Sequence, residues 1–346
     1  MGLVTYVVRR LLLMIPVLVG VSVLIFAISM LFSPYQRATL YVRNPQALNP
    51  HTIEGIITKY NLNGSMFSQY FSWISEVFHG SLGWSTTVRQ PVTTALLERF
   101  PATFEIVLIA APVIVILGIW LGVQSAVHRN TLIDHGTRTI AILGWSLPSF
   151  WFGILLVSFF YVYLGWLPRG GRLSSPIQAF VTSASFVRYT GSNIIDGILN
   201  GQLWVTGDAI LHVLLPATVI IVIDIAIIIR VMRSSMLEVL NKSYIIAAKA
   251  KGLTQKQVIN KHARRNALIP TITISGLIIG GLITGLVITE TVFAIGGLGR
   301  WAAQAALNID MPAVLGFAMF TAVVFLISNL IVDVLYAYID PRIRLA

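Results

Sequence analysis

The sequence contains no cysteine and few charged residues. Of its 346 residues only 11% are Asp, Glu, Lys or Arg, whereas 56% are hydrophobic, and soluble proteins carry about 25% charged residues. The absence of cysteine excludes a disulfide framework, thiolate metal sites and thiol catalysis. The shortage of charge excludes a soluble globular domain, because too few polar side chains are available to cover its surface. The hydrophobic excess must therefore face lipid.

The sequence also lacks the patterns of nucleotide hydrolysis and metal catalysis. No glycine is followed by lysine, which excludes a phosphate-binding loop of the Gly-x4-Gly-Lys-Ser/Thr type. The six histidines form no His-x3-His pair and no cluster with acidic residues that suits a metal ion. We predict no catalytic residue and no metal ligand, so that any ATP used must be hydrolysed by another subunit.

Several apolar stretches are long enough to cross a bilayer, which requires about 20 mostly apolar residues in a helix. The six stretches are 11–32, 101–123, 140–164, 209–229, 271–292 and 313–338. The first exceeds the usual signal-peptide core of about 7–15 residues and is followed by no small-residue cleavage site, so we predict an uncleaved anchor. The predicted fold is an all-α polytopic membrane protein with six transmembrane helices.

Lys and Arg concentrate in one set of connecting segments. If the N-terminus is cytoplasmic, 15 of the 24 basic residues lie in the inner segments 1–10, 124–139, 230–270 and the tail 339–346. The positive-inside rule then predicts that both termini face the cytoplasm. Because the excess positive charge lies beside apolar segments, it sets topology and contacts anionic lipid. This placement argues against nucleic acid as a partner.

The outer loop 33–100 is predicted to be partly helical. Asn49 followed by Pro50 forms an N-cap and first-turn pair. Two stripes of apolar residues follow at helical spacing: Ile53, Ile56, Ile57 and Tyr60, and then Phe67, Tyr70, Phe71, Ile74, Val77 and Phe78. The two helices pack on the outer mouth of the bundle or lie in the membrane interface, and both packing and ligand contact remain open as their role.

The longest inner segment, 230–270, has the features of a docking element. It contains a short predicted helix around Ser243 to Lys251, with three alanines within four residues and a glycine, Gly252, at its exit. Such a helix has a flat face that can enter a groove on another protein. The alternative is a basic loop that only fixes topology, but that role requires no alanine cluster and no glycine bend.

A second helix is predicted immediately after this bend. Thr254 and Gln257 match a capping box, and Leu253 with Val258 matches a hydrophobic staple. We expect this helix to cover about Gln255–Asn266 and to end at Pro270, where the fifth span would begin.

These residues resemble the coupling loop of ABC importer permeases, in particular the first permease subunit of the dipeptide/oligopeptide branch. The loop fragments are Tyr244, Ala250-Lys251-Gly252-Leu253 and Arg265-Asn266-Ala267, with Pro270. Further fragments in family order are Arg9-Arg10-Leu11, Gly80-Ser81-Leu82-Gly83, Gln90-Pro91-Val92, Arg99-Phe100-Pro101-Ala102-Thr103, Ser146-Leu147-Pro148-Ser149-Phe150-Trp151, Leu164-Gly165-Trp166-Leu167-Pro168, His212, Leu215-Pro216-Ala217, Glu290-Thr291-Val292-Phe293, Gly297-Leu298-Gly299-Arg300, Asn329, Asp333, Tyr336 and Asp340-Pro341-Arg342. The chain departs from the family pattern at Asp224, Ile246 and Gly296.

The resemblance implies a peptide-importing permease in the cell membrane that works with separate subunits. These are a homologous second permease forming a heterodimer, two ABC ATPases that carry ATP and Mg, and an extracytoplasmic substrate-binding protein. The chain itself binds no cofactor. Transport of an oligosaccharide or nickel is the alternative within the same family. The ATPase-coupling residues implied are Ser243, Tyr244, Ala247, Ala248, Ala250, Lys251, Gly252 and Arg265.

Four acidic residues lie within the predicted spans and raise the possibility of an ion-coupled secondary transporter. Glu105, Glu290 and Asp333 are close to span ends, where pairing or capping is the ordinary explanation. Only Asp224 lies well inside a span, where a carboxylate costs at least about 2.5–3.5 kcal/mol. We predict that Asp224, together with Pro148 and Trp151, is a candidate for the translocation path. One deep acid gives little support to ion coupling.

Overall fold

The computed structural model describes residues 3–42 and 49–339 and is mostly helical. Within these residues, five helices are long and apolar enough to cross a membrane, and six spans result if one bent pair is counted as a span. The spans lie in α1 (Leu3–Ser29), α5 (Val92–Val127), α10 (Leu203–Leu240), α13 (Arg264–Ile283) with the helix preceding it, and α16 (Met311–Ile339). The bent pair is α6 (Leu132–Ser146) with α7 (Ser149–Leu156) and its π-helical continuation η3 (Val157–Tyr163). The prediction of an all-α polytopic membrane protein is confirmed.

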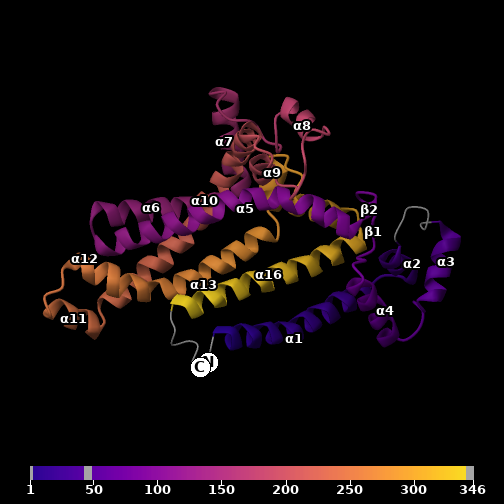
Figure 1. The fold of residues 1–346 in the computed structure, drawn as a ribbon, viewed down its shortest axis with the longest axis horizontal. Helices are drawn as coiled ribbons and strands as arrows, with labels where there is room; N and C mark the ends of the chain where they lie inside the picture. Colours follow the sequence, from indigo (N-terminus) through magenta and orange to yellow (C-terminus); the bar gives the residue numbers. More distant parts are fainter. Residues whose placement is uncertain (1–2, 43–48, 340–346) are drawn as a thin grey trace.

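Helices α1, α5, α13 and α16 run roughly along the long axis of the molecule, with short elements at both ends (Figure 1). The inner end, as we call it, carries α11 (Ser243–Ala250), α12 (Gln255–Gln257) and the π-helical η4 (Val258–Ala263). The outer end carries α2 (Pro34–Ala38), η1 (Thr39–Tyr41), α3 (Pro50–Lys59), α4 (Met66–Phe78), β1 (Trp84–Ser85) and β2 (Gln90–Pro91). The remaining elements are α8 (Ser175–Val181), α9 (Asn193–Leu199), α14 (Val287–Val292) and α15 (Leu298–Leu307).

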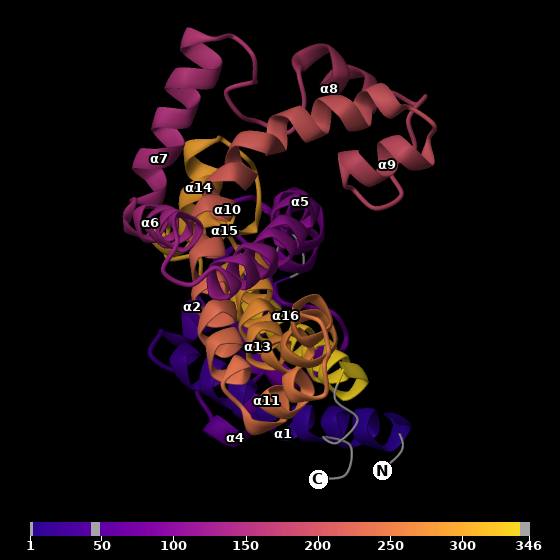
Figure 2. The ribbon, with the colours of Figure 1, turned by 90° about the vertical axis from the view of Figure 1, so that its left-hand side faces the viewer.

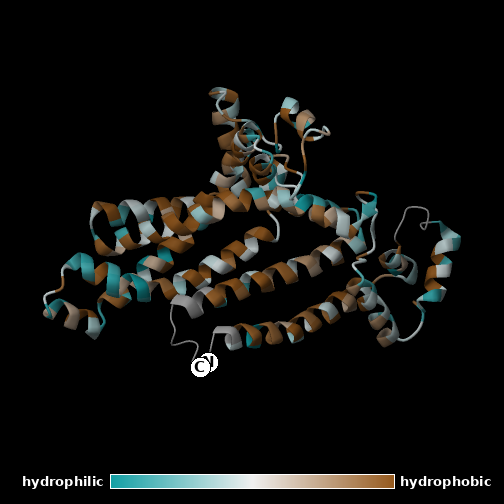
Figure 3. Ribbon diagram, in the orientation of Figure 1, coloured by the Kyte–Doolittle hydropathy of each residue, from teal (hydrophilic) through white to brown (hydrophobic). Residues whose placement is uncertain are grey.

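The beginning of α1 and the end of α16 lie close together and toward the inner end (Figure 1). Viewed from that end, α1 lies at one edge of the bundle, while α7, α8 and α9 project at the opposite edge (Figure 2). Hydrophobic residues dominate α1, α13 and α16, whereas hydrophilic residues gather in α12 and beside it (Figure 3). The cytoplasmic placement of both termini stays a prediction, and the tail 340–346 lies outside the described residues.

The core of the bundle is the contact between α5 and α10. Buried aliphatic residues of the two helices, such as Ile106 and Val213, share one cluster. Two glycines of α5 permit the helices to approach closely: a Cβ atom added at Gly118 would lie 2.6 Å from Ile228 Cγ2, which is closer than packing allows. Small residues at such crossings are typical of helices that associate within a bilayer.

The third span is bent rather than continuous. We expected one helix over 140–164, but α6 ends at Ser146 and α7 leaves at 102° to it. The cause is local, because the ring of Pro148 disfavours helical geometry at the preceding residue. Leu147 is accordingly extended, with φ −78° and ψ 128°.

The fourth and fifth spans also differ from their predicted limits. α10 continues to Leu240, so the first part of segment 230–270 extends a spanning helix. The expectation that a helix ends at Pro270 is wrong, because Pro270 lies inside α13. Membrane helices tolerate such a proline when neighbouring groups satisfy the freed carbonyl. α13 ends at Ile283, before the predicted limit of 292, because the chain turns at Gly285 with φ +125°.

The two helices predicted in the outer loop are present. Asn49 caps α3 by accepting a hydrogen bond from the Thr52 amide at 2.8 Å, with Pro50 in the first turn. α4 packs on α1, and α3 packs on α2. Ile53 of α3 and Trp73 of α4 belong to one hydrophobic cluster with residues of α1 and α16. The outer-loop helices therefore belong to the folded body of the protein.

Candidate functional site

Helix α11 at the inner end presents two different faces. Ile245 and Ala248 are buried against the bundle, whereas Ser243, Ala247 and Ala250 are exposed. Residues three or four apart lie on one face of a helix, so this exposed face carries only small side chains along its centre. The arrangement leaves a flat surface pointing away from the bundle.

Among the predicted coupling residues, seven have exposed positions and one does not. The exposed residues are Ser243, Tyr244, Ala247, Ala250, Lys251, Gly252 and Arg265. Ala248 instead contacts the cluster of residues beneath the helix. It anchors α11 and does not belong to its outward surface.

The bend after α11 is a complete Schellman motif. Gly252 has φ +80°, a conformation that favours glycine. Its amide donates to the carbonyl of Lys249 at 3.0 Å, and the amide of Leu253 donates to the carbonyl of Ala248 at 3.3 Å. These bonds satisfy the last carbonyls of the helix and fix the direction in which the chain leaves it.

The predicted capping box starts the following helix. The Gln257 amide donates to Thr254 Oγ1 at 3.4 Å, and the Thr254 amide donates to Gln257 Oε1 at 3.0 Å. Leu253 and Val258 lie in the same hydrophobic cluster, as expected for a staple. The two helices are also joined by a hydrogen bond from Asn266 Nδ2 to the Tyr244 hydroxyl at 3.2 Å. The inner end is therefore a built element with fixed angles.

The substitution Thr254→Ala should loosen the first turn after the bend. It removes a cap that stabilises the helix by about 1 kcal/mol. Local opening of residues 255–263 should then be roughly fivefold more populated, and amides that exchange through this opening should exchange roughly fivefold faster. Ser243→Ala is the control, since the Ser243 hydroxyl has no hydrogen-bond partner in the part of the chain that the structure describes. Equal exchange in the two variants would contradict the role of the cap.

A buried ion pair fixes the base of this inner element. The Asp134 carboxylate at the start of α6 accepts two hydrogen bonds from the Arg233 guanidinium on α10, at 2.7 and 2.8 Å. It also accepts bonds from Ser125 Oγ at 2.6 Å and from the Asn130 amide at 3.0 Å. The pair ties the turn between α5 and α6 to the helix that leads into α11. Sequence analysis missed it, because the partners are far apart in the chain.

Three of the four acidic residues in the predicted spans have partners, as expected. Asp333 pairs with Arg10 at 3.2 Å across α1 and α16. Glu290 is buried and accepts hydrogen bonds from Thr103 Oγ1 at 2.6 Å and from the Arg300 amide at 2.8 Å. This cluster brings together fragments that are about 190 residues apart, and it leaves no room for a side chain at Gly297, where a Cβ atom would lie 2.4 Å from Glu290 Oε1.

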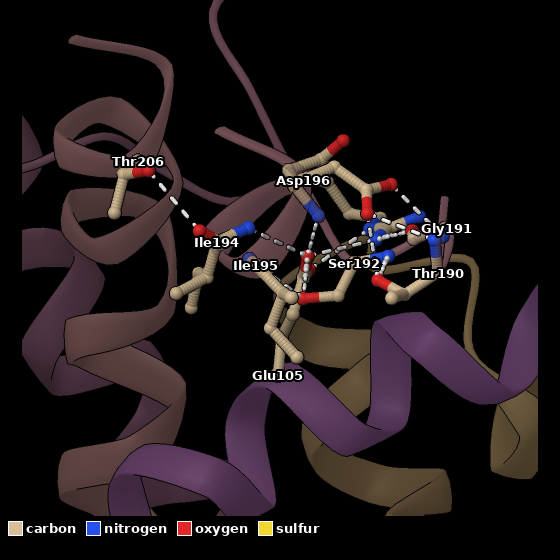
Figure 4. Close-up of polar contacts among 10 residues, drawn as sticks. Glu105, Thr190, Gly191, Ser192, Ile194, Ile195, Asp196 and Thr206 are labelled. Carbon is tan, nitrogen blue, oxygen red and sulfur yellow. Dashed lines mark hydrogen bonds and ion pairs between the residues drawn. The ribbon is translucent and has the colours of Figure 1, made fainter. Parts of the chain in front are cut away.

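Glu105 on α5 is the centre of a second cluster. Its carboxylate is buried and pairs with Arg172 at 2.9 and 3.0 Å. It also accepts hydrogen bonds from the backbone amide of Asn193 and, at 3.2 Å, from Ser192 Oγ. Figure 4 shows the carboxylate rising from α5 toward the first residues of α9. One side chain thus holds the segment between α7 and α10 to the bundle.

The three candidates for the translocation path lie at the start of α7 and on α10. Pro148 lies at the bend between α6 and α7, and Trp151 is exposed in the first turn of α7. Asp224 is half-buried on α10 and, within residues 3–42 and 49–339, has no hydrogen-bonding or ionic partner. Their role in the translocation path stays a prediction.

Comparison with known proteins covers nearly the whole chain. Residues 114–345 match the family described as binding-protein-dependent transport system inner membrane component. Residues 3–107 match the family that describes the N-terminal part of such membrane components. The chain is 37% identical over 339 residues to the dipeptide transport system permease protein DppB of Escherichia coli K12, covering 98% of both chains. It is 36% identical over 342 residues to the di/tripeptide transport system permease protein DppB of Pseudomonas aeruginosa, again covering 98% of both. The oligopeptide transport system permease protein AppB of Bacillus subtilis is 35% identical over 343 residues, covering 98% of this chain and 99% of AppB.

Proposed function

The chain belongs to the family of binding-protein-dependent transport system inner membrane components, and from this premise we propose that it is the permease subunit of an ABC importer for di- and oligopeptides. The observation that carries the proposal is the similarity to peptide permeases along 98% of the chain. The alternative cargoes, an oligosaccharide or nickel, are not favoured by these relatives. The chain acts through conformational change and not as an enzyme.

The energy for this change is proposed to come from ATP hydrolysed on partner subunits. Two ABC ATPases, with their ATP and Mg, would bind at the inner end, where a flat helix surface and a rigid bend are available. The exposed face of α11, with Ala247 and Ala250 at its centre, fits a groove without protruding side chains. When the groove on the ATPase moves, α11 would move with it. The movement would be transmitted to α10 through the buried side of α11 and through the short turn at residues 241–242.

The remaining partners follow from the same family. A homologous second permease would complete the translocation path between the two subunits, and an extracytoplasmic binding protein would deliver the peptide. In this proposal the inner end is cytoplasmic, and the protein is a multi-pass component of the cell membrane. Asp224, Pro148 and Trp151 remain candidates for the lining of the path. Asp224 and Trp151 lie in helices that can span the membrane, and Pro148 lies at the break of the bent pair.

Uptake into proteoliposomes tests this function directly. The chain is reconstituted with its second permease, its two ATPases and its binding protein, and labelled dipeptide, oligopeptide, maltose-type sugar and Ni²⁺ are compared as cargo. We expect ATP-dependent uptake of peptide that persists when ionophores collapse proton and sodium gradients. Uptake by the permease alone, or uptake abolished by the ionophores while ATP is present, would overturn the proposal in favour of an ion-coupled transporter.

A further inference from the structure

Helix α4 at the outer end has a row of exposed phenylalanines. Phe67, Phe71 and Phe78 are 79%, 66% and 84% exposed. At 3.6 residues per turn they fall within roughly 40° of the helix circumference. They lie on the side of α4 opposite Gln69 and Trp73, which are the buried residues of this helix. A soluble surface does not normally gather large apolar side chains into one stripe.

The exposed half of α4 is divided between this stripe and a row of serines. Ser68 and Ser75 are exposed and Ser72 is half-buried. Helical geometry centres this row about a quarter turn from the phenylalanines, with Ser75 nearest to them. The helix therefore has a buried side, an aromatic side and a hydroxyl side. An apolar stripe next to a polar one is the pattern of a helix that lies in the boundary between lipid and water.

Contacts with α1 place α4 at the outer end of a spanning helix. The Tyr70 hydroxyl is 2.8 Å from Ser22 Oγ, and the rings of Tyr70 and Trp73 lie 5.4 and 5.7 Å from the ring of Phe26. α1 ends at Ser29, only one turn beyond Phe26. Since α1 rises 1.5 Å per residue, α4 lies at the level where this span leaves the hydrocarbon core.

The spanning helix beside α4 also exposes apolar side chains near its outer end. The outer half of α1 exposes residues such as Leu24 and Ile28, and Figure 1 shows α4 beside this end of α1. Aromatic residues are enriched where membrane proteins cross the bilayer interface. We propose that α4 inserts its phenylalanine stripe, Phe67, Phe71 and Phe78, into the outer leaflet of the membrane, with the serine row facing water.

This lipid contact gives the outer loop an attachment to the membrane itself, besides its packing on α1 and the hydrogen bonds of Ser85 and Thr87 to Asp310 at the start of α16. Without it, the segment between α1 and α5 would be held only through its buried side. With it, α3, α4 and the β1–β2 hairpin form a platform whose height above the bilayer is fixed. The inference concerns the outer loop alone and does not depend on which cargo the protein carries.

Spin labelling tests the insertion, and the cysteine-free sequence makes single labels straightforward. Phe67→Cys and the control Ser68→Cys are labelled with a nitroxide in the full chain, reconstituted with its partner subunits in bilayer nanodiscs. Position 67 should collide with oxygen several times more often than with a water-soluble nickel chelate. Position 68 is also exposed but lies about 100° further around the helix, so it should show the opposite preference.

Two results would overturn the proposal. Equal access of the nickel chelate to both positions would show that the stripe faces water. Low access of both collision partners at position 67 would show that another protein covers it. Phe71→Cys and Phe78→Cys repeat the measurement on the same stripe, and since both side chains are exposed, neither substitution removes a buried contact.

Discussion

A chain with proline at position 252 is expected to insert into the membrane normally and to lose ATP-driven peptide uptake. Proline fixes φ near −65°, whereas Gly252 has φ +80°. Proline also lacks the amide that donates to Lys249, and it disfavours the conformation of residue 251. The cost is about 3 kcal/mol or more, which would reduce the population with the native bend more than a hundredfold.

The substitution at position 252 should disturb only the bend after α11 and not the membrane-spanning helices. The bend lies outside the spanning helices, and nothing lies within 4 Å of where a Cβ atom at residue 252 would be. Insertion and packing of the bundle should therefore be unaffected. What changes is the angle between α11 and the helix that follows, and under the proposed function that angle aligns the docking face with the ATPase.

Gly201→Pro is a matched control for Gly252→Pro. Gly201 has φ +68° and follows α9, and its amide donates to the carbonyl of Ile198 at 3.0 Å. Proline at position 201 likewise cannot adopt the positive φ and removes the amide donor, but this position lies away from the inner end. Copurification of the ATPase and ATP-dependent uptake should be lost in Gly252→Pro and retained in Gly201→Pro. Normal uptake by Gly252→Pro would contradict the coupling role of α11.

The features that sequence analysis located correctly are those encoded by neighbouring residues. The helix over Ser243–Ala250, the bend at Gly252 and the cap at Thr254 each depend on fewer than ten consecutive residues. The same holds for the Asn49 cap of α3. Local backbone preference and capping are properties of a short segment, so they can be inferred without knowledge of the tertiary structure.

The features that sequence analysis missed depend on contacts between distant segments. Asp134 meets Arg233 and Glu105 meets Arg172 only after the helices pack. Ala248 was assigned to the docking surface, because the alanine cluster alone does not reveal which side of α11 meets the bundle. The sharp division of the stretch 140–164 into two helices was not predicted either, although a proline at position 148 allows a bend. Apolar length measures the capacity to cross a bilayer and not the straightness of the helix.

The substitution Glu105→Gln is expected to release the segment between α7 and α10 from the bundle. Removal of one partner from a buried ion pair typically costs 3–5 kcal/mol, because the other charge is left uncompensated. Since the Arg172 side chain keeps 22% exposure, we expect a loss of about 3 kcal/mol in the free energy of unfolding. Trypsin should cleave after Arg188 faster than in the wild type, and the unfolding temperature in detergent should fall.

Glu98→Gln controls for the loss of a negative charge elsewhere in α5. Its partner Arg99 is 3.8 Å away, and the Glu98 side chain is 59% exposed. Such an exposed pair contributes about 0–1 kcal/mol, so this variant should unfold and be cleaved much as the wild type is. If Glu98→Gln were as unstable as Glu105→Gln, loss of charge in α5 would be responsible, and not loss of the buried pair.

A double variant separates the charge of Arg172 from the hydrogen bonds of Glu105. In Glu105→Gln the new amide oxygen can still accept from Ser192 and from the amide of Asn193, which the native carboxylate does. The remaining defect is then the unpaired guanidinium. Adding Arg172→Leu removes that charge, so the double variant should be more stable than Glu105→Gln alone. Additive losses would show instead that the two residues act independently, and that Glu105 holds α9 through its backbone contacts only.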